Sequence, residues 1–226
     1  MITKTYSLWI KTGAKEHMES LFNDGIVYMN TIGSFRKHSK DNPRFDPHEG
    51  ASFIKQCHSG EVDINGKTFK LEPPIQLYGY EEHHKGNIYC LYSKEKPSDT
   101  FGLEEPQHLG IDFSGLDFDS ENDTAVVILN ILEFLNRVEA NAKQKGYGFD
   151  HCYIEYYDPK IEEGNLGPFL KSNKYESQKE YRFWIPKIET KEVVLEIGSI
   201  HDIALILPAK DCEKFHYKSV DPRSND

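Results

Sequence analysis

The alternation of apolar and polar residues predicts a strand, a helix and a second strand at the start of the chain. Residues 6–11 alternate as in a half-buried strand, and Gly13 interrupts the pattern. Residues 14–24 carry apolar side chains at helical spacing, and Gly25 follows them as a C-terminal cap. Residues 26–30 predict the next strand. This order is typical of a fold that mixes helices and strands.

The clearest local pattern is a β-hairpin. Two alternating runs, residues 61–64 and 67–71, flank the pair Asn65-Gly66. An Asn-Gly pair between such runs is the strongest short-range signal for a two-residue turn that joins antiparallel strands. We interpret this hairpin as an excursion from the rest of the fold.

The remaining apolar pattern predicts further strands and two helices. Strands are expected at residues 87–93, 109–113, 151–157, 193–197 and 203–207. A long amphipathic helix is expected over residues 125–145, whose first five residues are strand-like, and a short helix over residues 168–177. The sequence has no internal repeat and no change of composition that would mark a linker. The simplest account is a single α+β domain over residues 1–226.

The charge balance limits the possible partners. The 226 residues include 37 Asp and Glu against 27 Lys and Arg, which gives a formal net charge of -10. This is the opposite of the broad basic surface of a tight, nonspecific nucleic-acid binder. An enzyme that acts on nucleic acid through a local basic patch remains compatible with this charge. For such an enzyme we expect single strands, bound in a confined groove with stacking aromatic residues.

Cysteine usage and hydropathy favour a cytoplasmic protein. The four cysteines have no Cys-x-x-Cys spacing, which predicts neither a zinc site nor a disulfide framework. Residues 1–5 lack the apolar run of a signal peptide, and no later apolar stretch approaches the roughly 20 residues needed to span a bilayer. We therefore expect a protein that is neither secreted nor inserted in a membrane.

A Gln-x-Glu motif carries the most specific chemistry. Gln178 and Glu180 stand directly before the aromatic, strand-like run Tyr-Arg-Phe-Trp-Ile. Alternate residues of a strand share a face, so we expect the amide and the carboxylate to point the same way. A carboxylate can hold a ribose hydroxyl and face a developing oxocarbenium cation, while an amide positions the nucleophile. The alternative is a solvated strand edge without function.

A polar segment at residues 36–50 carries a second set of candidate residues. It is too long for a tight turn, and long loops in compact domains are often functional. Arg36 and Arg44 could grip a pyrophosphate through their guanidinium forks, although a solvated loop is the alternative. The acids Asp41, Asp46 and Glu49, with His48, could hold a divalent ion as in a nuclease or could order Arg44.

Other constellations are weaker. His83 and His84 follow two glutamates, but neighbouring residues diverge in direction, and we predict no metal site there. Cys57 beside His58, and Cys152 beside His151, could be imagined as nucleophile and base. Sequence neighbours rarely face one another, so we interpret these cysteines as core residues.

The order of elements, taken with the motif, resembles the ADP-ribosyltransferase superfamily. Within it, the chain looks like the bacterial DNA-targeting ADP-ribosyltransferase toxins and related uncharacterised phage-defence families. The features that carry the resemblance are Asn23-Asp24-Gly25, the arginine-bearing loop, the strand at 88–93, Gln178-Lys179-Glu180-Tyr181 and the segment 197–204. The resemblance implies a split pair of small mixed or antiparallel β-sheets that grip NAD, with a few flanking helices.

The resemblance also implies roles for individual residues. Glu180 would be the catalytic glutamate, Gln178 would orient the acceptor, and Arg44, slightly preferred over Arg36, would be the catalytic arginine. Two departures stand out from the family pattern. By the resemblance, Lys11 and Thr12 would occupy the nicotinamide side, where the superfamily often has Arg or His-Gly, and Tyr92 and Ser93 would stand in for a Ser-Thr-Ser strand.

We therefore expect an NAD-dependent ADP-ribosyltransferase that modifies nucleic acid or, as the less favoured acceptor, protein. Such an enzyme would be a toxin or phage-defence effector with NAD as co-substrate, and a neutralising antitoxin protein is a possible partner. One alternative is a catalytically silent interaction module in which Glu180 pairs with Arg182 or Arg44 on the surface. Another is a metal-dependent nuclease built on Asp41, Asp46 and Glu49.

Overall fold

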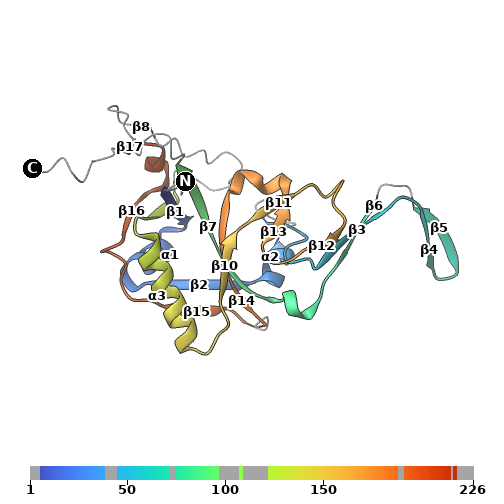
Figure 1. Ribbon diagram of the computed structural model, residues 1–226, viewed down its shortest axis with the longest axis horizontal. Helices are drawn as coiled ribbons and strands as arrows, with labels where there is room; N and C mark the ends of the chain where they lie inside the picture. Colours follow the sequence, from blue (N-terminus) through green and yellow to red (C-terminus); the bar gives the residue numbers. More distant parts are fainter. Residues whose placement is uncertain are drawn as a thin grey trace, which may run out of the picture. The chain divides into compact units, whose positions relative to one another are not determined.

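The protein has a mixed α+β fold with mostly antiparallel sheets and few helices, as seen in a computed structural model (Figure 1). The structure describes residues 6–38, 45–71, 75–96, 107–108, 122–187, 191–214 and 216–217. Contacts divide the chain into two compact units. Unit 1 comprises the described parts of Met1–Val27, Cys90–Lys145 and Val194–Asp226, and unit 2 those of Tyr28–Tyr89 and Gly146–Val193. The single domain expected from the sequence stays a prediction.

The sheet of unit 1 is antiparallel. Strand β1 (Tyr6–Gly13) pairs on one side with β7 (Gly86–Lys96) and on the other with β9 (Thr124–Ile128), and β9 in turn pairs with β16 (Ala204–Pro208). Residues 90–96 of β7 belong to this unit, and its earlier residues belong to unit 2. A short pair, β8 (Gln107–His108) and β17 (His216–Tyr217), is also antiparallel.

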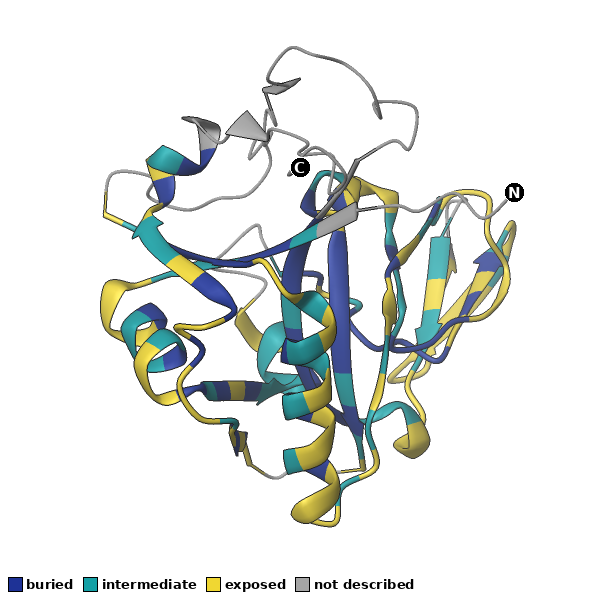
Figure 2. Cartoon of the chain, turned by 60° about the vertical axis from the view of Figure 1, so that its left-hand side comes forward, coloured by how far each residue is buried: buried dark blue, intermediate teal, exposed yellow. Residues whose placement is uncertain are grey.

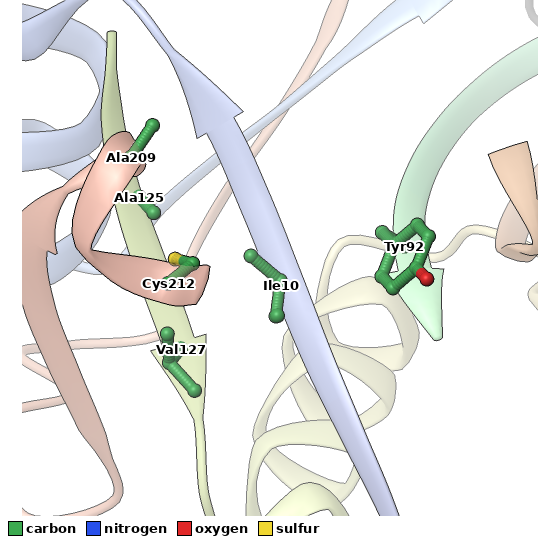
Figure 3. Packing of buried hydrophobic residues seen from close by; sticks show 6 residues of the cluster. All are labelled: Ile10, Tyr92, Ala125, Val127, Ala209 and Cys212. Carbon is green, nitrogen blue, oxygen red and sulfur yellow. The ribbon is translucent and has the colours of Figure 1, made fainter. Parts of the chain in front are cut away.

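The core of unit 1 forms where strands β1, β7 and β9 meet. Figure 3 shows Ile10 between Val127 and Tyr92, which are its register partners on the two neighbouring strands. A 3-10 helix, Ala209–Lys214, adds Ala209 and Cys212 to the same buried cluster. Buried residues, dark blue in Figure 2, gather along the strands, whereas the helices carry many exposed positions. The apolar alternation in the sequence therefore corresponds to real burial.

Two helices accompany this sheet. Helix α1 (Lys15–Asp24) buries Met18 and Leu21, and helix α3 (Ile131–Gln144) buries Phe134, whose ring packs edge-on to Trp9 at 6.5 Å. The prediction that a helix starts near residue 125 is wrong. Residues 125–128 are fully buried and mostly β-branched, so they form a strand. Asn130 then caps α3 by accepting a hydrogen bond from the backbone N–H of Glu133 at 3.1 Å.

Gly25 ends α1 in a crowded place. Its φ is +66°, and a Cβ there would lie 1.9 Å from the carbonyl oxygen of Gly198. Gly25→Ala is therefore expected to lower the free energy of unfolding by about 2–4 kcal/mol, because strain and overlap add. Gly146→Ala is the matched control, since Gly146 has a φ of +77° with open space around it. Urea denaturation should show only about 1–2 kcal/mol for the control, and equal losses would contradict the role of the overlap.

Unit 2 contains several small sheets and also strands of the eight-stranded sheet that the described residues form. The bounds of its remaining elements are β2 (Ile26–Thr31, shared with unit 1), α2 (Ile32–His38), β3 (Phe53–Cys57), β4 (Gly60–Ile64), β5 (Lys67–Leu71), β6 (Ile75–Gly79), β10 (Asp150–Tyr153), β11 (Glu155–Tyr157), β12 (Gly164–Asn165), β13 (Leu170–Ser172), β14 (Glu180–Pro186), β15 (Val193–Glu196, also shared) and the 3-10 helices Glu82–His84 and Asn173–Gln178. Strand β3 pairs with β6 and β12, and β10 pairs with β14, all antiparallel. Strands β11 and β13 are parallel.

Several local predictions for unit 2 are confirmed and others are corrected. The hairpin β4–β5 turns through Asn65 and Gly66, both with positive φ as a two-residue turn requires. The single strand expected at 151–157 is two strands, because the first residues pair with β14, whereas Glu155–Tyr157 pairs with β13. The short helix expected at 168–177 is β13 followed by a 3-10 helix.

Two further points concern the rest of the chain. The strand expected at 109–113 lies outside the described residues. The strands expected at 193–197 and 203–207 are confirmed as β15 and β16. Among the helices that the structure describes, none combines the length and the apolar character needed to cross a bilayer.

Candidate functional site

Four charged side chains close a ring in the interior of unit 2, and we call them the ion ring: Glu49, Lys171, Glu180 and Arg182. Arg182 donates from Nη1 to Glu49 Oε1 and from Nη2 to Glu180 Oε2, each at 2.7 Å. Lys171 Nζ lies 2.5 Å from Glu180 Oε1 and 3.6 Å from Glu49 Oε2. Each acid thus touches both bases, and the formal charges sum to zero.

Strand alternation and a turn bring these residues together. Glu180 and Arg182 are two apart in β14 and share one face, whereas Tyr181 and Phe183 turn to the other face and contact each other there. Lys171 is the central residue of β13. Glu49 ends a turn, where its backbone N–H bonds to the carbonyl of Asp46. The ring therefore ties a strand, a short strand and a turn that are far apart in sequence.

The ion ring is shielded from water. The exposed fractions are 2% for Glu49, 3% for Lys171, 7% for Glu180 and 0% for Arg182. Burial alone would raise the pKa of Glu180, but the charges of Lys171 and Arg182 and their hydrogen bonds hold that pKa well below its usual range. Glu180 is therefore ionised throughout the physiological pH range. Each charge in the ring depends on its partners, because an unpaired buried charge is very unfavourable.

Neutral groups complete the ring. Lys171 Nζ also donates to Oε1 of Gln178 at 2.7 Å, and Arg182 Nη1 also donates to the carbonyl of Pro168. The backbone N–H of Glu180 donates to the hydroxyl of Tyr156 at 3.0 Å. The amide of Gln178 and the carboxylate of Glu180 thus meet at one ammonium group.

This geometry both supports and corrects the interpretation of the Gln-x-Glu motif. The two side chains converge, but they do not share a strand. Gln178 ends a 3-10 helix, Lys179 adopts a left-handed conformation with φ of +41°, and β14 begins at Glu180. The left-handed residue reverses the local direction, and convergence therefore comes from a turn and not from strand alternation. The alternative of a solvated strand edge is wrong, since both side chains are buried.

Asp46 is a further buried carboxyl beside the ring. Its Oδ1 accepts the backbone N–H of His48 at 2.8 Å. Burial, followed by the nearby charge of Glu49, raises the pKa of Asp46, whereas hydrogen bonds and Lys171 act in the opposite direction. Asp46 therefore differs from Glu180, whose pKa is lowered. Two carboxyls with pKa values moved apart are typical of sites that use one as an acid and the other as an anion.

The raised pKa of Asp46 predicts a pH dependence with a definite sign. A carboxyl whose pKa is higher in the folded than in the unfolded state stabilises the fold below its unfolded pKa, near 3.8. That stabilisation disappears as the pH rises through the folded pKa. Asp46→Asn should therefore gain stability relative to the wild type between pH 4 and pH 7. Urea denaturation at both pH values measures this difference, and a decrease with pH would contradict the assignment.

Arg36 reaches the same region, and Arg44 lies outside the described residues. Arg36 extends from α2, donates from Nη1 to the backbone carbonyl of Glu49 at 3.1 Å, and lies over the ring of Tyr80. Arg36, one of the two arginines expected from the sequence, is thus hydrogen-bonded to Glu49 of the ion ring.

The four residues expected on the cofactor side lie in unit 1. Lys11 and Thr12 are on β1, and Tyr92 and Ser93 are on the neighbouring part of β7. Lys11 Nζ donates to the carbonyl of Cys90 at 2.8 Å. Tyr92 packs in the core cluster and Ser93 is also buried, so little of the Tyr92 ring is available for stacking. The two pairs of residues thus lie on adjacent strands, where Ser93 pairs with Trp9 and Tyr92 with Ile10.

Two of the acids proposed for a nuclease, Asp46 and Glu49, lie among the described residues and have other partners. Asp41 lies outside the described residues, and the carboxylate of Glu49 is bonded to Arg182. Within the described ranges, no group of three or more His, Cys, Asp or Glu side chains could hold a metal ion. His83 and His84 contact each other edge-on, and His83 lies 3.2 Å from Glu81.

Sequence reasoning missed Lys171 and the role of Glu49. Lys171 follows a short apolar run, Pro-Phe-Leu at residues 168–170, which is a weak sign that it is buried. Glu49 carries no such sign, since it stands among polar residues. Comparisons of the chain with family models, with curated proteins and with solved structures found no match.

Proposed function

We propose that the chain is an NAD-dependent ADP-ribosyltransferase whose acceptor is nucleic acid. The observation that carries the proposal is the convergence of Gln178, Glu180 and Arg36 within unit 2. Gln178 and Glu180 share the ammonium group of Lys171, and Arg36 is bonded to the backbone of Glu49 in the same ring. These are an amide, an ionised carboxylate and a guanidinium, the groups to which the resemblance to ADP-ribosyltransferases gives roles in transfer from NAD.

The carboxylate of Glu180 retains capacity to bind a substrate. An ionised carboxylate has about four acceptor sites, and Lys171 and Arg182 occupy one on each oxygen. A ribose hydroxyl of NAD could therefore donate to Glu180 without breaking the ring. In the transfer reaction the bond between nicotinamide and ribose breaks, nicotinamide leaves with the bonding electrons, and the acceptor nucleophile forms the new bond to the ribose carbon and releases its proton to water. Glu180 would stabilise the positive charge on the ribose during this exchange.

A second candidate rests on the same contacts. Both oxygens of Glu180 are already bonded to cations and the side chain is 7% exposed, which favours a purely structural role. The chain would then be a catalytically silent interaction module. Unlike the surface pairing expected from the sequence, Glu180 pairs with Arg182 in the interior.

Incubation of the purified chain with labelled NAD and mixed DNA, RNA and protein acceptors tests the first proposal. We expect release of nicotinamide and labelled ADP-ribose on nucleic acid. If no NAD is consumed, no label is transferred and NAD does not shift the melting temperature, the enzyme proposal fails and the silent module stands. EDTA has no effect in either case, whereas EDTA-sensitive cleavage of the nucleic acid would favour the nuclease.

A further inference from the structure

A cluster of aromatic rings and an arginine lies beside the ion ring in unit 2. We call it the stacking cluster: Arg36, His48, Tyr78 and Tyr80. The rings of His48 and Tyr78 are stacked, with centroids 3.5 Å apart and planes at 8°. Nδ1 of His48 lies 3.1 Å from the hydroxyl of Tyr80, and the guanidinium of Arg36 lies over the Tyr80 ring, 4.7 Å from its centroid. Four side chains from a helix, a turn and a strand end are thus held in one arrangement.

The stacking cluster is on the surface and is ordered from below. Tyr80 is 45% exposed, and the other three side chains are half-buried. Arg36 is anchored to the carbonyl of Glu49, and the hydroxyl of Tyr78 is hydrogen-bonded to that of Tyr157. Side chains that are fixed before a ligand arrives lose little entropy when it binds. Exposed aromatic rings in fixed positions are therefore suited to binding a ligand, and they contribute little to the hydrophobic core.

The chemistry of the cluster fits a nucleotide. Nucleobases stack on tyrosine and histidine rings irrespective of sequence, and a guanidinium can stack on a base or grip a phosphate. Burial lowers the pKa of His48, so its ring is neutral at physiological pH and offers a flat, uncharged face. The hydroxyl of Tyr80 adds a hydrogen-bonding group at the edge of the platform.

We infer that the stacking cluster binds a base of single-stranded nucleic acid beside the ion ring. This inference rests on the proposed function and names its acceptor class. The net charge of -10 opposes attraction of the strand over long distances, so short-range stacking would supply most of the affinity. Binding should consequently weaken only slightly with salt, about as expected for one or two neutralised phosphates.

The test uses the full chain and two labelled single-stranded probes of one mixed sequence, a DNA dodecamer and an RNA dodecamer, in fluorescence anisotropy. Tyr80→Ala should weaken binding of the better probe about five-fold or more, and Tyr80→Phe should stay within about two-fold because the ring remains. Tyr28→Ala is the matched control, since Tyr28 is a 50% exposed tyrosine of the same unit. The affinity of Tyr28→Ala for the same probe should equal that of the wild type.

The outcomes separate this inference from the proposed function. Binding that depends on Tyr80 supports the inference, whether or not NAD is consumed. Absence of binding to both probes, or equal losses in Tyr80→Ala and Tyr28→Ala, overturns it. If NAD is consumed and the label goes to protein while neither probe binds, the transferase proposal stands and the acceptor is protein. Circular dichroism of each variant shows whether it is folded. If Tyr80→Ala does not fold, Arg36→Ala, which should also weaken binding, tests the inference instead.

Discussion

Glu180→Gln is expected to lower the rate of the proposed ADP-ribose transfer by about 100- to 1000-fold, with little change in the affinity for NAD. Glutamine keeps the shape and the hydrogen-bonding capacity of the side chain but removes the charge. A charge that opposes a cation only in the transition state affects turnover and not ground-state binding. Single-turnover transfer from labelled NAD measures the rate, and a thermal shift titration measures the affinity.

The ion ring complicates this experiment, and it also supplies the control. In Glu180→Gln the cations Lys171 and Arg182 share only Glu49, so a buried positive charge is left over. Loss of stability could then be mistaken for loss of catalysis. The double variant Glu180→Gln with Lys171→Met leaves Glu49 opposite Arg182 and restores neutrality. A folded double variant without transfer activity supports a catalytic Glu180, whereas full activity in either folded variant places catalysis elsewhere.

If the chain is a toxin with this activity, growth inhibition in cells allows the wild type and the double variant to be compared. Expression of the wild-type chain without an antitoxin should inhibit growth, and the charge-balanced double variant should not. Both chains must accumulate to similar amounts for the comparison to hold. Equal inhibition by the two would argue against an effect that depends on Glu180.

The sequence predicts the elements of this fold better than it predicts their ends. The alternating runs at β1, β15 and β16 and the Asn-Gly hairpin are local patterns, and local patterns determine local structure. The errors arise where long-range contacts decide. Residues 125–128 fit a helix by spacing, yet pairing with β1 and β16 makes them a strand. Residues 151–157 look like one strand in the sequence, yet they divide in two because β10 pairs with β14 and β11 pairs with β13.

The candidate site was predictable only in part for the same reason. Gln178 and Glu180 stand out as a motif in the sequence. Their side chains do converge, but through a turn at Lys179 and not through the strand alternation that we expected. Lys179 has a positive φ that the sequence does not predict, since such a conformation is usually found at glycine or asparagine. Arg182 binds Glu49 across 133 residues of sequence, and no local pattern contains a contact of that kind. The ion ring is a tertiary property.

Lys171→Met is expected to lower the free energy of unfolding by about 3–5 kcal/mol, the usual cost of removing one partner from a buried ion pair. Methionine keeps most of the aliphatic length of lysine, so the loss reports on charge and hydrogen bonds more than on packing. Without the ammonium, Glu49 and Glu180 have only Arg182 between them, and Gln178 loses the donor to its side-chain oxygen. Urea denaturation followed by circular dichroism measures the change.

Lys174→Met provides the matched control for that variant. Lys174 is three residues further along the chain, is exposed, and lies 5.5 Å from the centroid of the Tyr175 ring. Its replacement should change the free energy of unfolding by less than about 0.5 kcal/mol. Similar losses at both positions would mean that the charge of Lys171 has no special role and that the ring is a set of independent contacts.

The double variant Lys171→Met with Glu49→Gln tests whether the ring acts as one unit. Each single change leaves an unbalanced buried charge, but the two together leave Glu180 opposite Arg182 in a neutral pair at 2.7 Å. The double variant should therefore lose less stability than the sum of the two single variants, by about 1–3 kcal/mol. Strict additivity would show that the four side chains do not share their charges. Coupling of that size would explain why the chain keeps four buried charges. Removal of any one of them alone would leave an unpaired buried charge among the other three.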